Sequence, residues 1–192
     1  MEMASTSVES SLARISAEID TVIGHLVSGE PNALARVVDL ITAAPRVFVL
    51  GAGRSGLALR MTAMRLMHLG LDVHVVGEVT TPAIAAHDLL ITASGSGTTA
   101  GILRAAQTAV DAGAKVAAIT TACDSPLAQL ATATVVVPAA TKLDRSETAS
   151  IQYSGSLFEQ VGVVLGDALF DALWQRSGLS ADELWPRHAH LE

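Results

Sequence analysis

The sequence has few residues of several types, and each shortage excludes a class of protein. Cys123 is the one cysteine in 192 residues, so a disulfide framework is excluded and a reducing compartment is expected. The first ten residues, MEMASTSVES, have neither a basic start nor an apolar segment, and we do not expect a signal peptide. These absences predict a cytoplasmic protein.

Charge is scarce as well. Charged residues make up 16% of the chain and hydrophobic residues 50%, whereas an average domain has about 25% charged residues. With so little charge to cover its surface, the chain is expected to bury apolar area against copies of itself as a homo-oligomer. The net charge of -7 and the lack of a basic cluster argue against nucleic acid as a partner. The longest apolar stretch, residues 161–174, contains Asp167 and Asp171, so it is not expected to span a membrane.

The length predicts a single domain over residues 1–192. Residues 1–44 are expected to form two helices, 8–28 and 32–43, that pack on the core. Beyond them, strands and helices alternate. The expected strands are 46–50, 73–76, 88–92, 115–120 and 134–138, and the expected helices are 57–69, 98–112, 125–131 and 156–175.

This alternation predicts an α/β fold, a three-layer sandwich around a five-stranded parallel sheet. Five such strands most often take the flavodoxin-like order 2-1-3-4-5. Ligands then bind at the carboxyl ends of strands 1 and 3, where the order reverses. Each of these two strands runs into a glycine-rich loop, so the two loops are expected to lie side by side.

The loop after the third expected strand, residues 94–99, reads SGSGTT. Its glycines let the backbone approach a ligand closely, and the helix behind it offers unpaired N–H groups to an anion. The alternative is a plain helix start with Thr98 as the N-cap, but a cap needs one hydroxyl and this loop has four. We therefore predict a phosphate site. Its residues are Ser94, Gly95, Ser96, Thr98 and Thr99.

The loop after the first expected strand, residues 51–56, reads GAGRSG and matches the dinucleotide pattern G-x-G-x-x-G. Glu78, beyond the second strand, could bind a ribose hydroxyl, so an NAD-dependent oxidoreductase is one alternative. An oxidoreductase of this kind would have no use for the hydroxyl-rich loop at residues 94–99. Gly53, Arg54 and Ser55 place a cation and a hydroxyl in the middle of the loop, which suits a sugar phosphate.

Two further residues are candidates for acid–base chemistry. Glu159 follows Ser156 in the pattern S-x-x-E, which fits a helix capping box as well as a catalytic base. His68 lies near the end of the helix after the first glycine loop, and its spacing fits packing as well as catalysis. His188 and His190 have ligand-like spacing but no acidic or cysteine partner beside them, so no metal site is expected.

Several segments together resemble a known family. They are VLGAGRSG (49–56), MRLMHLG (64–70), VGE with TP (76–82), SGSGTT (94–99), TKLD (141–144) and SLFEQ (156–160). The chain from residue 33 onward is similar to the sugar isomerase (SIS) domain. More narrowly, MRLMHLG, SLFEQ and the short length resemble the 6-phospho-3-hexuloisomerases.

The resemblance implies a SIS fold and interconversion of D-arabino-hex-3-ulose 6-phosphate and D-fructose 6-phosphate. It implies a cofactor-free homotetramer in the ribulose monophosphate pathway of formaldehyde assimilation. The residues that match the family's site are Ser94, Ser96, Thr98 and Thr99 for the phosphate, Arg54 and Ser55 for the sugar, Glu159 as the base and His68 near the reacting end. SIS domains also sense phosphosugars in transcription regulators, so a phosphosugar-binding regulatory module is the alternative.

Overall fold

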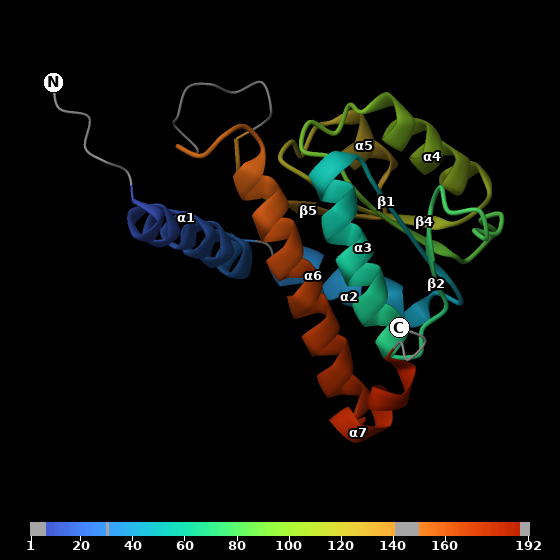
Figure 1. Ribbon diagram of the computed structural model, residues 1–192. Helices are drawn as coiled ribbons and strands as arrows, with labels where there is room; N and C mark the ends of the chain where they lie inside the picture. The colour runs from blue at the N-terminus through green and yellow to red at the C-terminus, as the bar shows by residue number, and fades with distance from the viewer. Residues whose placement is uncertain (1–6, 30, 141–149, 189–192) are drawn as a thin grey trace, which may run out of the picture.

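A five-stranded parallel sheet forms the centre of the computed structural model, which describes residues 7–29, 31–140 and 150–188 (Figure 1). The strands are β1 (Val47–Gly51), β2 (Val73–Val75), β3 (Leu89–Ala93), β4 (Lys115–Thr120) and β5 (Ala133–Val136). Their order in the sheet is β2-β1-β3-β4-β5, and every neighbouring pair is parallel. The predicted sheet and its flavodoxin-like order are confirmed.

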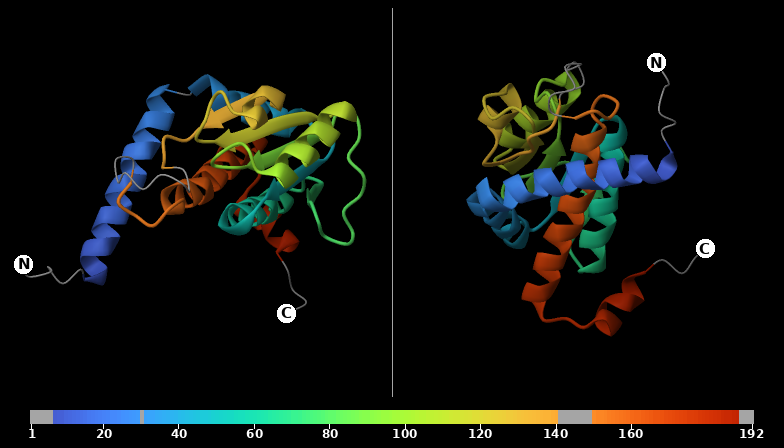
Figure 2. Two further views of the ribbon diagram at one scale, coloured as in Figure 1. Left: turned by 90° about the horizontal axis from the view of Figure 1, so that it is seen from above. Right: turned by 90° about the vertical axis from the view of Figure 1, so that its left-hand side faces the viewer.

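Helices cover both faces of this sheet (Figures 1 and 2). The helices of the described residues are α1 (Val8–Gly29), α2 (Pro31–Ala43), α3 (Gly53–His68), α4 (Ala100–Asp111), α5 (Pro126–Leu130), α6 (Ser156–Ser177) and α7 (Ala181–Leu184), and those that lie against the sheet are α2 to α6. Val47 and Val49 of β1 pack in one core with α2, α3 and α6, whereas Phe48 packs in a second core with α4 and α5. Successive side chains of a strand point to opposite faces, so the three-layer sandwich is confirmed.

The register of β1 and β3 brings the two glycine-rich loops to one edge of the sheet. Gly51, the last residue of β1, pairs with Ala93, the last residue of β3. The loops that follow these strands therefore start side by side, as predicted. The first loop is also unusually close-packed, since a Cβ atom on Gly56 would meet the carbonyl oxygen of Gly51. Position 56 therefore has no room for a side chain, and only glycine fits there.

Some boundaries differ from the expectation. The helix predicted from residue 57 begins at Gly53, so Arg54 and Ser55 lie in its first turn and not in an open loop. Helix α4 begins at Ala100, two residues later than predicted. After α6, helix α7 and a 3₁₀ turn at Trp185–Arg187 were not predicted at all.

The N-terminal helices contact the core unequally. Helix α2 buries Val37, Val38 and Ile41 in the core that also contains β5 and α6. Helix α1 buries only Val22 and Leu26, in its second half. Its first half projects away from the sheet (Figures 1 and 2).

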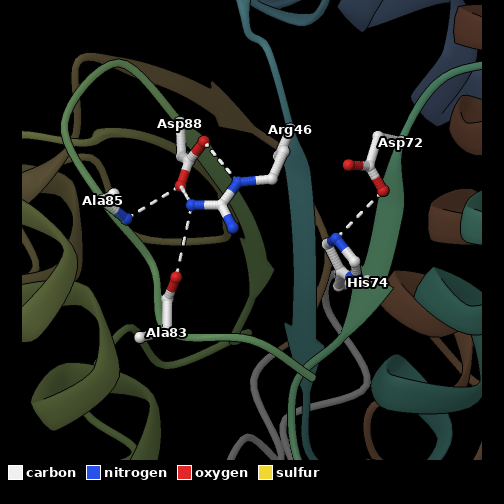
Figure 3. Close-up of polar contacts among 6 residues, drawn as sticks. All are labelled: Arg46, Asp72, His74, Ala83, Ala85 and Asp88. Carbon is white, nitrogen blue, oxygen red and sulfur yellow. Dashed lines mark hydrogen bonds and ion pairs between the residues drawn. The ribbon is translucent and has the colours of Figure 1, made fainter. Parts of the chain in front are cut away.

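An ion pair holds the β2–β3 connection at the opposite edge of the sheet from the glycine loops (Figure 3). Arg46 donates from Nε to Asp88 Oδ1 at 3.1 Å and from Nη2 to Asp88 Oδ2 at 2.6 Å. The same guanidinium bonds the carbonyl of Ala83, and Ala85 N donates to Asp88. A paired, bidentate contact of this kind suits a carboxylate that is 1% exposed.

Within the described residues, no helix has the length and apolar character that crossing a membrane requires.

Candidate active site

A cavity of about 300 Å³ lies at the carboxyl edge of β1 and β3. It is bordered by both glycine loops and by the start of α6. The lining includes Ala52, Ser55, Ser94, Gly95, Ser96, Thr98, Thr99, Gly155 and Phe158. A volume of this size is at the lower end of the range for small-ligand sites. The structure thus brings together six of the predicted site residues, Ser55, Ser94, Gly95, Ser96, Thr98 and Thr99.

The 94–99 loop is held rigidly by the end of β4. The carbonyl oxygen of Gly95 accepts hydrogen bonds from Thr120 Oγ1 at 3.1 Å, from Thr121 Oγ1 at 2.8 Å and from Thr121 N at 3.0 Å. Gly97 has φ of 62°, and a Cβ atom there would collide with Ser125. The loop is therefore fixed before any ligand arrives, which lowers the entropy cost of binding.

The hydroxyl groups of this loop bond to one another and not to the start of the helix. Ser94 Oγ and Thr99 Oγ1 are 2.9 Å apart, and Thr98 Oγ1 is 2.9 Å from Ser96 Oγ. The N-cap of α4 is Thr99, whose side chain makes no capping bond. The alternative of Thr98 as a simple N-cap is therefore wrong. These hydroxyls, together with the first N–H groups of α4, can donate to an anion.

Arg54 and Glu159 form an ion pair, and neither residue belongs to the lining of the cavity, although each is a sequence neighbour of a residue that does, Ser55 and Phe158 respectively. Arg54 Nη1 lies 3.1 Å from Glu159 Oε2 and 3.4 Å from Ser156 Oγ. The carboxylate is 6% exposed and the guanidinium side chain 59%. Glu159 also lines a small space next to the cavity, which it shares with Ser55. The pair joins the first turn of α3 to the first turns of α6, with Gly53 at the start of α3.

The capping box expected at Ser156 and Glu159 is absent. The N-cap of α6 is Gly155, in the left-handed conformation with φ of 81°, and it makes no side-chain capping bond. The N–H of Ser156, which Glu159 would have to reach, donates instead to Tyr153 O at 3.0 Å. Of the two readings that the sequence left open, helix capping is excluded. Glu159 is instead a buried carboxylate facing a cation.

His68 lies far from this cavity within one chain. Helix α3 carries Arg54 in its first turn and His68 at its last residue, which separates them by about 20 Å at 1.5 Å per residue. The imidazole is 4% exposed and stacks on His188, with ring centroids 4.0 Å apart. Burial lowers the pKa of His68, and the nearby His188 and Arg65 lower it further. Within a single chain, His68 therefore packs against His188 near the C-terminus and is remote from the cavity. Its catalytic role stays a prediction.

Other predicted features lie outside the described residues. They are the TKLD segment (141–144) and His190. In the described part of the chain, no group of three or more histidine, cysteine, aspartate or glutamate side chains is arranged to hold a metal ion.

Sequence reasoning missed several residues that shape the site. Phe158 forms part of the wall beside Gly95, but its spacing on α6 marks it only as a core residue. Gly155 borders the cavity and begins α6. Thr120 and Thr121 anchor the 94–99 loop. The sequence carried a signal for them, because Thr120 ends the strand predicted over residues 115–120 and Thr121 follows it, and that strand is predicted to neighbour the strand before the 94–99 loop.

The arrangement offers three chemical capabilities in the cavity and in the small space beside it. The hydroxyls and helix N-terminus can hold a phosphate, the carboxylate of Glu159 can accept a proton, and the guanidinium of Arg54 can stabilise negative charge that develops on an oxygen. These are the parts needed to move a proton between neighbouring carbons of a phosphorylated sugar.

Known proteins share both the sequence and the fold. The SIS domain family matches residues 40–161. A 3-hexulose-6-phosphate isomerase of Mycobacterium gastri is 56% identical over 173 residues, covering 90% of this chain and 87% of that protein. The 3-hexulose-6-phosphate isomerase of Bacillus subtilis strain 168 is 37% identical, covering 94% and 97%. A crystal structure of a Methanococcus jannaschii protein, inferred to have 3-hexulose-6-phosphate isomerase function, superposes with a TM-score of 0.80 at 31% identity, covering 95% and 99%.

Proposed function

Because the chain belongs to the SIS domain family, we propose that it is an isomerase that interconverts D-arabino-hex-3-ulose 6-phosphate and D-fructose 6-phosphate. The relatives that match nearly its whole length bear the name of this activity. The observation that carries the proposal is the cavity lined by a hydroxyl-rich loop, which shares Ser55, Ala93 and Phe158 with the small space that the buried Glu159 lines. The reaction belongs to the ribulose monophosphate pathway.

The 94–99 loop holds the phosphate in this proposal. Ser94, Ser96, Thr98 and Thr99 line the cavity, and their hydroxyls replace the water that hydrates the dianion. The net charge of -7 makes the field of the whole protein unfavourable for an anion, so these local donors and the helix N-terminus have to supply the attraction. The bound phosphate fixes the sugar carbons relative to the acid–base groups.

The isomerisation moves a carbonyl from C3 to C2. Glu159 removes the proton from C2, which the adjacent ketone acidifies, and the electron pair of the broken C–H bond forms a 2,3-enediolate. Return of a proton to C3, with transfer of the hydroxyl proton from O2 to O3, completes the ketose exchange. Arg54 stabilises the charge on the enediolate oxygen. In this scheme His68 would shuttle the oxygen-bound proton only if a second copy of the chain brought it to the cavity.

Two alternatives have less support. A phosphosugar-binding regulatory module would need the 94–99 loop to hold the phosphate. It would have no use for the buried Glu159 carboxylate that faces Arg54. An NAD-dependent oxidoreductase fits the GAGRSG pattern, but Glu78, which would bind the ribose, forms an ion pair with Arg60, and the GAGRSG loop borders the same cavity as the 94–99 loop. The relatives named above favour the isomerase over both.

We also propose that the chain forms the homotetramer that the resemblance implies. Leu57, Met61 and Met64 are 62%, 52% and 58% exposed, and their spacing places them on one face of α3. A second copy is the partner that fits this strip, because it presents an identical apolar strip. Sedimentation analysis would support the proposal if it gave the mass of four chains of 19.8 kDa each, and the mass of one or two chains would contradict it.

The activity is tested by supplying D-arabino-hex-3-ulose 6-phosphate to the purified chain and following fructose 6-phosphate with a coupled NADP⁺-reducing assay. We expect saturable formation of fructose 6-phosphate. Tight binding of the sugar phosphate without turnover would contradict the isomerase and favour the regulatory module.

A further inference from the structure

The N-terminal helix reaches the candidate active site through one carboxylate. Glu18, in the middle of α1, accepts three hydrogen bonds from a short segment that precedes α6. Ser150 Oγ donates to Glu18 Oε2 at 2.7 Å, and Gln152 Nε2 donates to the same oxygen at 2.9 Å. The backbone N–H of Ile151 donates to Glu18 Oε1 at 3.1 Å. Both carboxylate oxygens are therefore used to hold residues 150–152.

The contacts continue from this segment into α6. Gln160 Nε2 donates to Gln152 Oε1 at 2.9 Å, and Gln160 is the residue after Glu159. The N–H of Gln152 also donates to Ser150 Oγ at 3.0 Å, which stiffens the segment itself. A continuous line of hydrogen bonds thus runs from α1 to the neighbour of the candidate base.

Only three residues separate this anchor from α6. Tyr153 O accepts a hydrogen bond from the N–H of Ser156, the first residue of α6, and Gly155, the N-cap, has the left-handed conformation and borders the cavity. A shift of residues 150–152 would therefore change the direction in which α6 starts. Since Glu159 lies in the first turns of α6, its carboxylate would move with respect to a bound sugar.

The rest of α6 is fixed by other contacts. Leu165, Leu169 and Leu173 are buried in the core, and α6 packs along α3, so the body of the helix does not depend on Glu18 for its existence. Burial alone would raise the pKa of Glu18, but the donors from Gln152, Ser150 and Ile151 outweigh it and the pKa lies below its ordinary value. The carboxylate is therefore charged at neutral pH and binds its three donors strongly.

We propose that Glu18 is a positioning residue for the isomerisation, fixing residues 150–152 and through them the start of α6 that carries Glu159. This inference rests on the proposed function. Glu18 is not part of the cavity lining, so it acts on the reaction through Glu159 and not on the substrate.

The test measures kcat and KM for Glu18→Ala and for the conservative Glu18→Gln, which keeps one acceptor oxygen. Because a small misplacement of a reacting group lowers turnover strongly, we expect kcat of Glu18→Ala to fall about tenfold with KM within about twofold of the unchanged chain. Glu18→Gln is expected to lose less. The matched control is Asp20→Asn, an exposed carboxylate on the same helix, which should retain full kcat.

A second comparison separates positioning from a merely structural role. If Glu18 acts through Glu159, then Glu18→Ala in the Glu159→Gln background should lower kcat by less than about twofold further, because coupled residues are not additive. An equal loss in both backgrounds, or unchanged kcat in Glu18→Ala, overturns the inference. If Glu18→Ala does not fold, Glu18→Gln carries both comparisons. A chain that makes no fructose 6-phosphate even without substitution overturns the proposed function itself, whereas an active chain indifferent to Glu18 overturns only this inference.

Discussion

Arg54 Nη1 lies 3.1 Å from Glu159 Oε2, and this contact joins the first turn of α3 to the first turns of α6. The pair places a cation against a buried carboxylate, and that carboxylate lines a small space which shares Ser55 and Phe158 with the cavity beside the 94–99 loop. An enediolate intermediate needs both, one to remove the proton and the other to stabilise the charge that results. The two residues are far apart in the sequence and meet because α6 packs along α3.

The cation of this pair is expected to act in the chemical step. Arg54→Met keeps the apolar stem and removes the charge, so we expect kcat to fall roughly ten- to a hundredfold. Steady-state kinetics measures the change. The control is Arg60→Met on the same helix, because Arg60 and Glu78 form an exposed ion pair and such pairs contribute little. Equal kcat in Arg54→Met and the unchanged chain would remove Arg54 from the mechanism.

The phosphate loop is expected to act mainly in binding. Ser94→Ala combined with Ser96→Ala removes two donors to the anion, so KM should rise at least about tenfold while kcat falls less. Thr108→Ala serves as the control, since that hydroxyl bonds Arg104 O on the exposed side of α4. An unchanged KM in the double variant would mean that the phosphate binds elsewhere.

The stacked histidines predict a pH dependence of stability. The pKa of His68 is lowered by burial, by His188 and by Arg65, so the unfolded chain takes up a proton at a higher pH than the folded chain does. The stability contributed by neutral His68 is fully present above its ordinary pKa of 6.5 and is lost as the pH falls through the lowered value.

Urea unfolding at about pH 8 and about pH 5 tests this pH dependence. The unchanged chain should lose more stability between the two conditions than His68→Phe, which keeps a stacked ring without the titrating group. His25→Gln, at an exposed position on α1, should show the full loss. The same pH dependence in His68→Phe and the unchanged chain would show that another group is responsible.

The sequence was informative about the sheet because period and composition mark strands that are covered on both faces. All five residues of β3 are buried, and the apolar run at 89–93 made that strand easy to recognise. Once the strand order follows from the alternation, the position of the phosphate loop beside Gly51 follows as well. This is why the predicted cavity could be located before the structure.

The pattern S-x-x-E shows where local reasoning fails. At Ser180 and Glu183 it forms a true capping box that starts α7, although no helix was predicted there. At Ser156 and Glu159 the same pattern caps nothing, because Gly155 turns the chain and Arg54 pairs with the carboxylate. The difference lies in tertiary contacts, which spacing along one segment does not reveal. The hydrogen bond from Gln152 to Glu18 could not be predicted for the same reason, since it joins two segments that are far apart in the sequence.

The most direct test of the central claim is kcat of Glu159→Gln, with binding of fructose 6-phosphate measured by calorimetry on the same preparation. The amide keeps the size of the side chain and its contact with Arg54 but accepts no proton. We expect kcat to fall by at least about a hundredfold while fructose 6-phosphate still binds. Turnover close to that of the unchanged chain would contradict the assignment of Glu159 as the base.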